Sequence, residues 1–111
     1  MPSVRQEKIA SLTQRELAQI FQRESIHLPT SVMVTVTVVR MSPDLSYARV
    51  YLSLLGADDP ADIIEQVNRD KGYYRRLLGK AVGKVLRIVP DIHFYLDDSL
   101  EYSERINELL H

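Results

Sequence analysis

Cysteine and tryptophan are absent from this chain of 111 residues, and glycine and proline are scarce, with four and five copies. Without cysteine the chain has no disulfide, no thiolate metal site and no cysteine nucleophile. No apolar run approaches the length of a membrane-spanning helix, and the first residues lack the apolar stretch of a secretory signal, so we expect a cytoplasmic protein. The length predicts a single domain spanning residues 1–111.

A large excess of either charge is also lacking, because the formal net charge is −1. The charges are nevertheless segregated along the sequence. Between residues 69 and 87 there are seven basic residues and one acid, Asp70 (net +6), whereas the remainder holds seven basic and fourteen acidic residues (net −7). The basic residues are Arg69, Lys71, Arg75, Arg76, Lys80, Lys84 and Arg87. Such a concentration of cations favours a polyanionic partner.

Hydrophobic periodicity predicts a helix followed by a β-hairpin in the first half of the chain. Ser3 and Gln6 have the spacing of a capping box, so we expect a helix from Val4 to Arg23. Alternating runs over residues 32–40 and 47–54, separated by the turn sequence 42–44, predict two antiparallel strands. In the first strand we expect one face to consist of Val32, Val34, Val36 and Val38, and the other of Met33, Thr35, Thr37 and Val39.

The second half predicts two helices, a strand and a closing helix. Asp59 before Pro60 indicates a helix start, and Gly72 predicts either two consecutive helices or one helix kinked near it. A third alternating run follows Pro90, and residues 97–99 are suited to capping a last helix whose inward side holds Tyr102, Ile106 and Leu109 or Leu110. We therefore predict an α+β fold of the order α-β-β-α-(kink)-α-β-α, with the helices packed on one three-stranded sheet.

A basic stripe is predicted along the helix that follows Gly72. On a helical wheel Arg76, Lys80, Lys84 and Arg87 share one side. The opposite, buried side is expected to hold Leu77, Leu78, Ala81, Val82 and Val85. A solvated helix face is the ordinary alternative, but such faces usually interleave acids with bases, and no acid lies between Lys71 and Arg87. Because like charges four residues apart repel, the stripe favours an anionic ligand.

Three glycines lie within this basic region. Gly72, Gly79 and Gly83 each weaken a helix by about 1 kcal/mol relative to alanine. Gly79 and Gly83 project near the margin of the basic stripe, where the missing side chains would let a phosphate backbone come close. Close packing, or tolerance at a kink, is the other interpretation, and the sequence leaves both open.

Other side chains give no comparable indication of chemistry. The three histidines are far apart and no His, Asp and Glu spacing suggests a metal site or a cofactor. Helix capping accounts for Asp97 and Asp98, so we do not expect an enzyme. Tyr47, Tyr51 and Tyr95 are expected on one face of the sheet, where base stacking is conceivable but packing at the core or its rim is favoured.

Several segments resemble one known family. The order α-β-β-α-α-β is that of a KH-type domain, a single-stranded RNA-binding fold. Residues 39–51, 77–82, 86–94 and 97–100 resemble, in order and spacing, corresponding segments of the ribosome-binding factor A family. The family carries an Ala-x-Gly kink in place of the KH Gly-x-x-Gly loop, and here the matching tripeptide is Asp70-Lys71-Gly72.

This resemblance implies a function in ribosome assembly. It implies a factor that binds the immature small (30S) subunit and its 16S ribosomal RNA, supports 5′-end maturation, matters in the cold and is displaced with help from a GTPase. The sequence leaves the oligomeric state open, and a monomer is the default expectation. The seven cations would contact RNA, and Asp70, Gly72, Gly79 and Gly83 would form the kink and allow backbone approach. The alternative hypothesis is an interaction module whose basic helical face docks an acidic protein.

Overall fold

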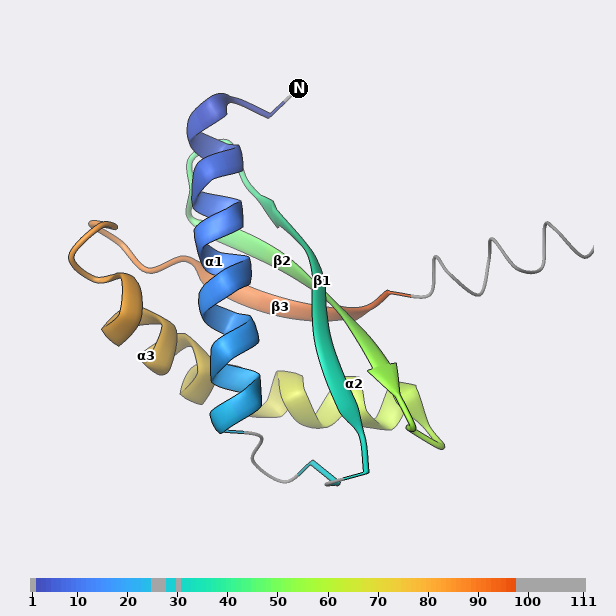
Figure 1. Cartoon of the computed structure of the whole chain (residues 1–111). Helices are drawn as coiled ribbons and strands as arrows, with labels where there is room; N and C mark the ends of the chain where they lie inside the picture. Colours follow the sequence, from blue (N-terminus) through green and yellow to red (C-terminus); the bar gives the residue numbers. More distant parts are fainter. Residues whose placement is uncertain (1, 25–27, 30, 98–111) are drawn as a thin grey trace, which may run out of the picture.

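Three helices pack against one face of a three-stranded sheet in the computed structural model, which describes residues 2–24, 28–29 and 31–97 (Figure 1). The elements follow in the order α1 (Val4–Arg23), β1 (Met33–Met41), β2 (Tyr47–Leu55), α2 (Pro60–Arg69), α3 (Lys71–Val82) and β3 (Asp91–Leu96). The predicted α+β class and element order are confirmed as far as β3. The closing helix predicted after Asp97 lies outside the described residues.

Helix α1 begins at the predicted capping box. The Ser3 hydroxyl accepts a hydrogen bond from the Gln6 amide at 3.1 Å, and the Gln6 side chain accepts one from the Ser3 amide at 2.8 Å. These bonds satisfy two amides that a helix start would otherwise leave unpaired. The buried side of the helix, which includes Leu17, Ile20 and Phe21, packs over β1 and α3. Within the described residues no helix combines the length and apolar character needed to cross a membrane.

The sheet has the order β1-β2-β3 and is mixed. Strands β1 and β2 form the predicted antiparallel hairpin, whereas β3 pairs parallel to β2. A parallel neighbour requires a crossover connection, and α2 and α3 provide it. The hairpin turn is held by Asp44, whose carboxylate accepts hydrogen bonds from both Ser42 and Ser46, while Leu45 adopts a positive φ of 63°.

One prediction about β1 is wrong, because the strand contains a β-bulge at Thr37. The pairing with β2 shifts register between Val36 and Val38. A bulge places an additional residue in one strand and reverses the side-chain alternation beyond it. Val39 therefore faces the core together with Val36, and Val38 moves to the opposite face beside Tyr51. The Gln14 side chain donates hydrogen bonds to the carbonyls of Val36 and Thr37, so the irregular backbone keeps its partners.

An aromatic cluster in the core joins α1 and α3 to the sheet. Phe21 of α1, Tyr74 of α3 and Phe94 of β3 have ring centroids 4.7 to 5.7 Å apart. Edge-to-face aromatic contacts of this kind add to the stabilisation that burial gives. The aromatic cluster therefore fixes α3 relative to β3.

Helix α2 starts as predicted. The Asp59 carboxylate accepts a hydrogen bond from the Asp62 amide at 3.2 Å, and Pro60 is the first helical residue.

Helix α3 is shorter than predicted. It ends at Val82, with Gly83 as its C-cap, so the residues that follow belong to a loop. Val85, expected on the buried side, is 65% exposed, and Ala81 is exposed as well. Leu86 instead turns back into the core and anchors the loop that leads to β3.

Candidate nucleic-acid interface

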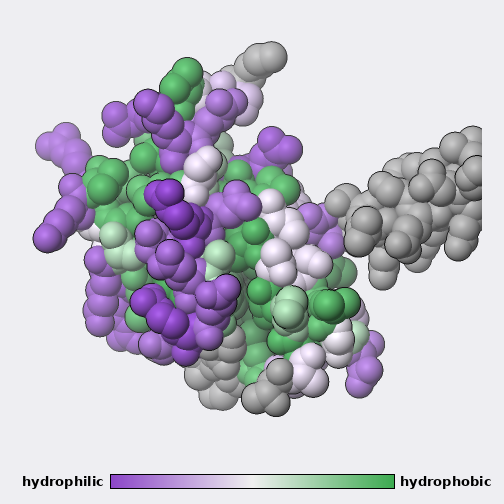
Figure 2. Space-filling view, in the orientation of Figure 1, coloured by the Kyte–Doolittle hydropathy of each residue, from purple (hydrophilic) through white to green (hydrophobic). Residues whose placement is uncertain are grey.

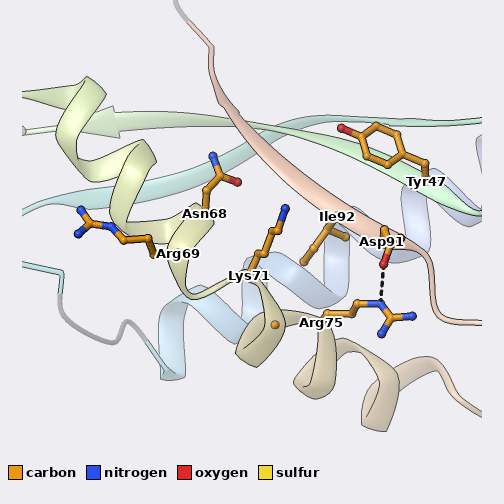
Figure 3. A pocket seen from close by; sticks show the side chains of 8 residues that line it. Tyr47, Asn68, Arg69, Lys71, Arg75, Asp91 and Ile92 are labelled. Carbon is orange, nitrogen blue, oxygen red and sulfur yellow. Dashed lines mark ion pairs between the residues drawn. The ribbon is translucent and has the colours of Figure 1, made fainter.

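The junction between α2 and α3 borders an open hollow of about 580 Å³ (Figure 3). One wall consists of Arg69, Lys71, Gly72 and Arg75. The other wall comes from the sheet and includes Tyr47 of β2 and Ile92 of β3. A volume of this size is within the range of sites for small ligands or a single nucleotide. The hollow thus gathers three of the seven predicted cations around one concave surface.

The chain bends at Asp70, two residues before the glycine that was expected to produce the kink. Asp70 has φ −95° and ψ 10°, and it is both the C-cap of α2 and the N-cap of α3. Its carbonyl accepts hydrogen bonds from the amides of Tyr73 and Tyr74. Two consecutive helices therefore form, which was one of the two predicted alternatives, and Gly72 lies in the first turn of α3.

Asn68 attaches the end of α2 to β3. Its side-chain amide donates to the Phe94 carbonyl at 2.9 Å, and its side-chain carbonyl accepts from the Phe94 amide at 2.8 Å. These two hydrogen bonds to the backbone of Phe94 fix the side of the hollow that Asn68 lines. Sequence analysis did not identify this residue, because its partners are 26 positions away along the chain.

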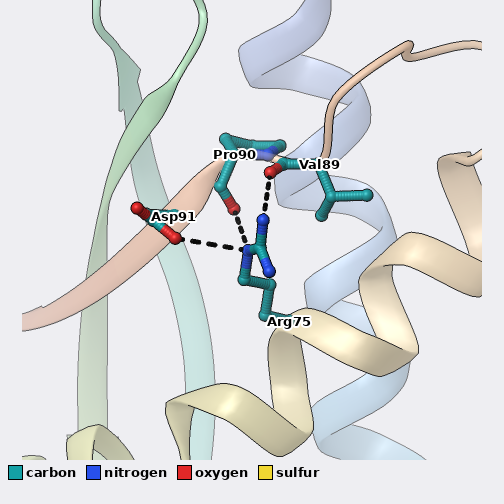
Figure 4. A network of polar contacts seen from close by, with 4 residues as sticks. All are labelled: Arg75, Val89, Pro90 and Asp91. Atoms are coloured by element: carbon teal, nitrogen blue, oxygen red, sulfur yellow. Dashed lines mark hydrogen bonds and ion pairs between the residues drawn. The ribbon is translucent and has the colours of Figure 1, made fainter.

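Arg75 is largely engaged by the protein itself (Figure 4). Its Nη2 donates to the Val89 carbonyl at 2.8 Å and its Nε donates to the Pro90 carbonyl at 3.2 Å. Nε also lies 3.4 Å from an Asp91 carboxylate oxygen. The side chain thereby ties α3 to the segment that enters β3, and part of its guanidinium is unavailable to a ligand.

The remaining cations are exposed but do not form the single helical stripe that was predicted. Arg76 and Lys80 lie on the solvent side of α3, whereas Lys84 and Arg87 lie in the loop after the helix. The helical wheel placed these four residues on one stripe only because the helix was assumed to continue past Val82. The cations therefore extend from the α2–α3 junction along α3 and into the following loop.

Arg76 is positioned by an aromatic neighbour. Its guanidinium carbon lies 5.5 Å from the centre of the Tyr73 ring, and the Tyr73 hydroxyl donates to the Glu24 carboxylate at 2.7 Å. That hydrogen bond to Glu24 raises the pKa of Tyr73 above its ordinary value. Cation–π contacts at exposed positions contribute only about 0.5–1 kcal/mol, so Arg76 would lose little stabilisation if it moved away from Tyr73 to bind a ligand.

The glycines of the basic region differ in their surroundings. A Cβ at Gly79 would lie 3.2 Å from a methyl group of Val89, and one at Gly83 would lie 2.7 Å from the Gly79 carbonyl oxygen. Close packing therefore accounts for both of these glycines. Gly72 is exposed, lines the hollow, and has no atom within 4 Å of where its Cβ would be, apart from its chain neighbours and the backbone of its own helix. Of the three, it is the one whose missing side chain leaves room for an incoming group.

A second basic feature combines residues from distant parts of the sequence. Arg87 and Arg5, at the start of α1, line a smaller hollow of about 150 Å³ beside the β1–β2 turn. The exposed hydrophobic residues Val85 and Ile88 lie in the same loop as Arg87, and Figure 2 shows hydrophobic and hydrophilic surface side by side where this loop projects. Arg5 was not identified from the sequence, since only the fold brings it near Arg87.

Among residues 2–24, 28–29 and 31–97 there is no group of three or more His, Cys, Asp or Glu side chains arranged to hold a metal ion. The polar groups of the hollow are instead guanidinium, ammonium and amide donors, with Asp91 as the acid that lines it. Guanidinium and ammonium groups around a concave surface are suited to binding phosphate.

Comparison with known proteins identifies the family. The profile of the family described as "Ribosome-binding factor A" matches residues 5–110. A protein of that name from Cytophaga hutchinsonii is 44% identical over 110 residues, covering 99% of this chain and 83% of the relative. A Pseudomonas aeruginosa protein of the same name is 39% identical over 109 residues, covering 96% and 82%.

Solved structures agree with this result. A solution structure of a Thermotoga maritima protein described as a ribosome binding factor A matches with a TM-score of 0.67 and 32% identity, covering 86% of this chain and 89% of that one. The crystal structure of ribosome-binding factor A from Thermus thermophilus matches in fold, with a TM-score of 0.68, 22% identity, and coverage of 82% and 94%. From the family match and the identities of its relatives, the chain belongs to the ribosome-binding factor A family.

Proposed function

We propose that this protein binds the small ribosomal subunit and contacts its 16S ribosomal RNA through the basic surface. That surface consists of Arg69, Lys71, Arg75, Arg76, Lys80, Lys84 and Arg87, all of which are exposed. The observation that carries the proposal is the hollow at the α2–α3 junction, where cations surround the open position at Gly72. The names of the relatives, and a Thermus thermophilus structure described as fitted into a map of a 30S–RbfA complex, support it.

The chemistry of the surface favours phosphate contacts. Cations that neutralise phosphates release counterions, and this release is the main source of sequence-independent affinity. At Gly72 the absence of a side chain lets a sugar–phosphate backbone approach α3, beside the ammonium of Lys71. Arg75 has a different role: its bonds to Val89 and Pro90 hold the loop and β3 in place while it lines the hollow.

Binding without chemical turnover suffices for a role in assembly. A protein that binds one RNA conformer better than its competitors shifts their populations. In line with the family resemblance, we extend the proposal to 5′-end maturation of 16S RNA, to a greater requirement in the cold, and to a cytoplasmic monomer released with help from a GTPase. The protein is proposed to act by binding and not as an enzyme.

Salt-dependent binding to purified small subunits tests the proposal. If about five cations contact phosphates, the logarithm of the affinity should fall with the logarithm of salt concentration with a slope of about −3.5 to −4.5. Replacing both Lys71 and Lys80 by Glu should weaken binding and make the slope less steep by about 1.4 to 1.8. Arg15→Glu is the matched control, because Arg15 is exposed on α1 and outside the basic surface.

An unchanged affinity in the Lys71→Glu, Lys80→Glu variant would refute the assigned surface. Nuclease treatment distinguishes the alternative of an acidic protein partner. Association through RNA should disappear when the RNA is digested, whereas a direct contact with an acidic ribosomal protein should survive.

A further inference from the structure

The face of the sheet opposite the helices is uncovered in the described part of the chain. The buried residues of α1, α2 and α3 belong to one core on the other face. On the open face, Met33 of β1 lies opposite Leu55 of β2, and these side chains are 62% and 69% exposed. Beyond the polar Thr35–Ser53 pair on the same face, the rings of Tyr51 and Tyr95 stack with centroids 5.5 Å apart. The open face therefore carries apolar and aromatic side chains on both sides of one polar pair.

A row of basic side chains crosses the same face. Arg40 of β1 lies opposite Arg49 of β2, which in turn lies beside His93 of β3. Neither arginine side chain has a hydrogen bond or an ion pair with another described residue. Like charges directly opposite one another destabilise a sheet. This repulsion would be relieved by an anionic group placed over the row.

The chain after β3 starts from this sheet. The Asp97 amide donates to the Leu52 carbonyl at 2.8 Å, and the Thr37 hydroxyl donates to the Asp97 carboxylate. Because Thr37 belongs to β1 and β2 lies between β1 and β3, the Thr37 contact holds Asp97 across the middle strand. Asp97, the last residue before the segment 98–111, is thus tethered to the sheet.

The composition of residues 98–111 is complementary to that of the open face, because the segment combines apolar with acidic side chains. Their apolar side chains recur at the helical spacing of Tyr102, Ile106 and Leu109, and their polar side is acidic. Four acids (Asp98, Glu101, Glu104 and Glu108) and one base, Arg105, give this segment a net charge of −3. As a helix, fourteen residues would extend about 21 Å, and nine-residue strands such as β1 and β2 extend about 30 Å. As a helix, the segment is therefore short enough to lie over the sheet without extending beyond it.

We propose that residues 98–111 fold back as an amphipathic helix over the open face of the sheet, placing the stripe formed by Tyr102, Ile106 and Leu109 against Val38, Tyr51 and Tyr95. The acidic side chains flank this contact and lower the repulsion between Arg40 and Arg49. Tethering at Asp97 makes the contact intramolecular, so a modest apolar area is sufficient to hold it. The proposal does not depend on RNA binding, and its main test is carried out without RNA.

Paramagnetic relaxation in the chain of 111 residues tests this contact. Because the protein has no cysteine, Ser103→Cys creates a single site for a nitroxide label. We expect a selective loss of amide peak intensity at Val38, Tyr51 and Tyr95, and none on the solvent side of α1. Adding Ile106→Asp should restore the lost intensity. Adding Asn107→Asp, which introduces the same charge on the polar side of the segment, should not.

Each other result would overturn the proposal. Full intensity on the sheet face would show that the segment does not dock there, and intensity unaffected by Ile106→Asp would exclude the apolar stripe as the contact. A loss seen only when labelled and isotope-enriched chains are mixed would identify a second copy as the occupant. Shifts at Tyr51 and Tyr95 that require added RNA would assign the face to nucleic acid.

Discussion

Arg75 and Arg76 are adjacent in sequence, and the structure predicts opposite consequences for their loss. Arg75 bonds the carbonyls of Val89 and Pro90, whereas Arg76 rests on the ring of Tyr73 and otherwise faces solvent. We therefore expect Arg75→Ala to lower the stability of the fold. Arg76→Ala should lower the stability less and should reduce affinity for small-subunit RNA.

The expected magnitudes follow from these contacts. Hydrogen bonds from a charged donor contribute about 1.5–3 kcal/mol each when well shielded. The Arg75 side chain is 44% exposed, so water replaces part of what is lost, and its pairing with the exposed Asp91 contributes little. We estimate a loss of about 1.5 kcal/mol for Arg75→Ala, which corresponds to a fall in melting temperature of about 5–10 °C for a domain of this size. Arg76→Ala removes one exposed cation–π contact, or about 0.5–1 kcal/mol.

Thermal unfolding followed by circular dichroism, together with salt-dependent RNA binding, measures both effects. Loss of one phosphate contact at Arg76 should make the salt slope less steep by about 0.7 to 0.9. Arg75→Lys is a useful companion, because lysine keeps the charge but cannot reach two carbonyls with a planar fork. The reasoning would be refuted if Arg75→Ala had the same melting temperature as the wild type, or if Arg76→Ala were the less stable variant.

Three further predictions concern the turn, the bulge and the glycines. Hydrogen bonds from the neighbouring serine side chains lower the pKa of Asp44 from 3.8 to about 2. The ionised carboxylate should therefore stabilise the turn above about pH 4 and lose this effect as the pH falls towards 2. A carboxyl NMR titration would measure the pKa of Asp44. Val39→Asp should lower the free energy of unfolding by more than about 3 kcal/mol in urea, and Val38→Asp by less, because only the former places a charge in the core between the sheet and the helices. Gly72→Ala should raise the melting temperature more than Gly79→Ala, whose new methyl group would crowd the loop before β3.

Local sequence patterns were sufficient to predict most of the fold. The capping box at Ser3, the Asp59-Pro60 start of α2 and the alternating runs all depend on neighbouring residues, and each lies where it was expected. The bulge in β1 was not predictable from alternation, because Val38 and Val39 are equally apolar and either would suit the core. The choice depends on pairing with β2 and on Gln14 of α1.

The candidate site was harder to predict than the fold. The segregation of positive charge was visible in the sequence, but the end of α3 at Val82 was not, so Lys84 and Arg87 were assigned to a helix that the structure ends earlier. The engagement of Arg75 depends on carbonyls fourteen and fifteen positions away. Contacts between distant segments determine which cations are free, and a single helical wheel contains no information about them.

The hydrogen bonds of Asn68 and Gln14 have a consequence for solubility. Strands β1 and β3 are the outer strands of the sheet, and outer strands offer unpaired backbone groups on which another chain can add by strand pairing. Asn68 occupies both backbone groups of Phe94 on β3, and Gln14 occupies two carbonyls at the bulge of β1. A side-chain amide thus protects each edge, so the sheet resists edge-to-edge aggregation without a further strand or a proline at either position.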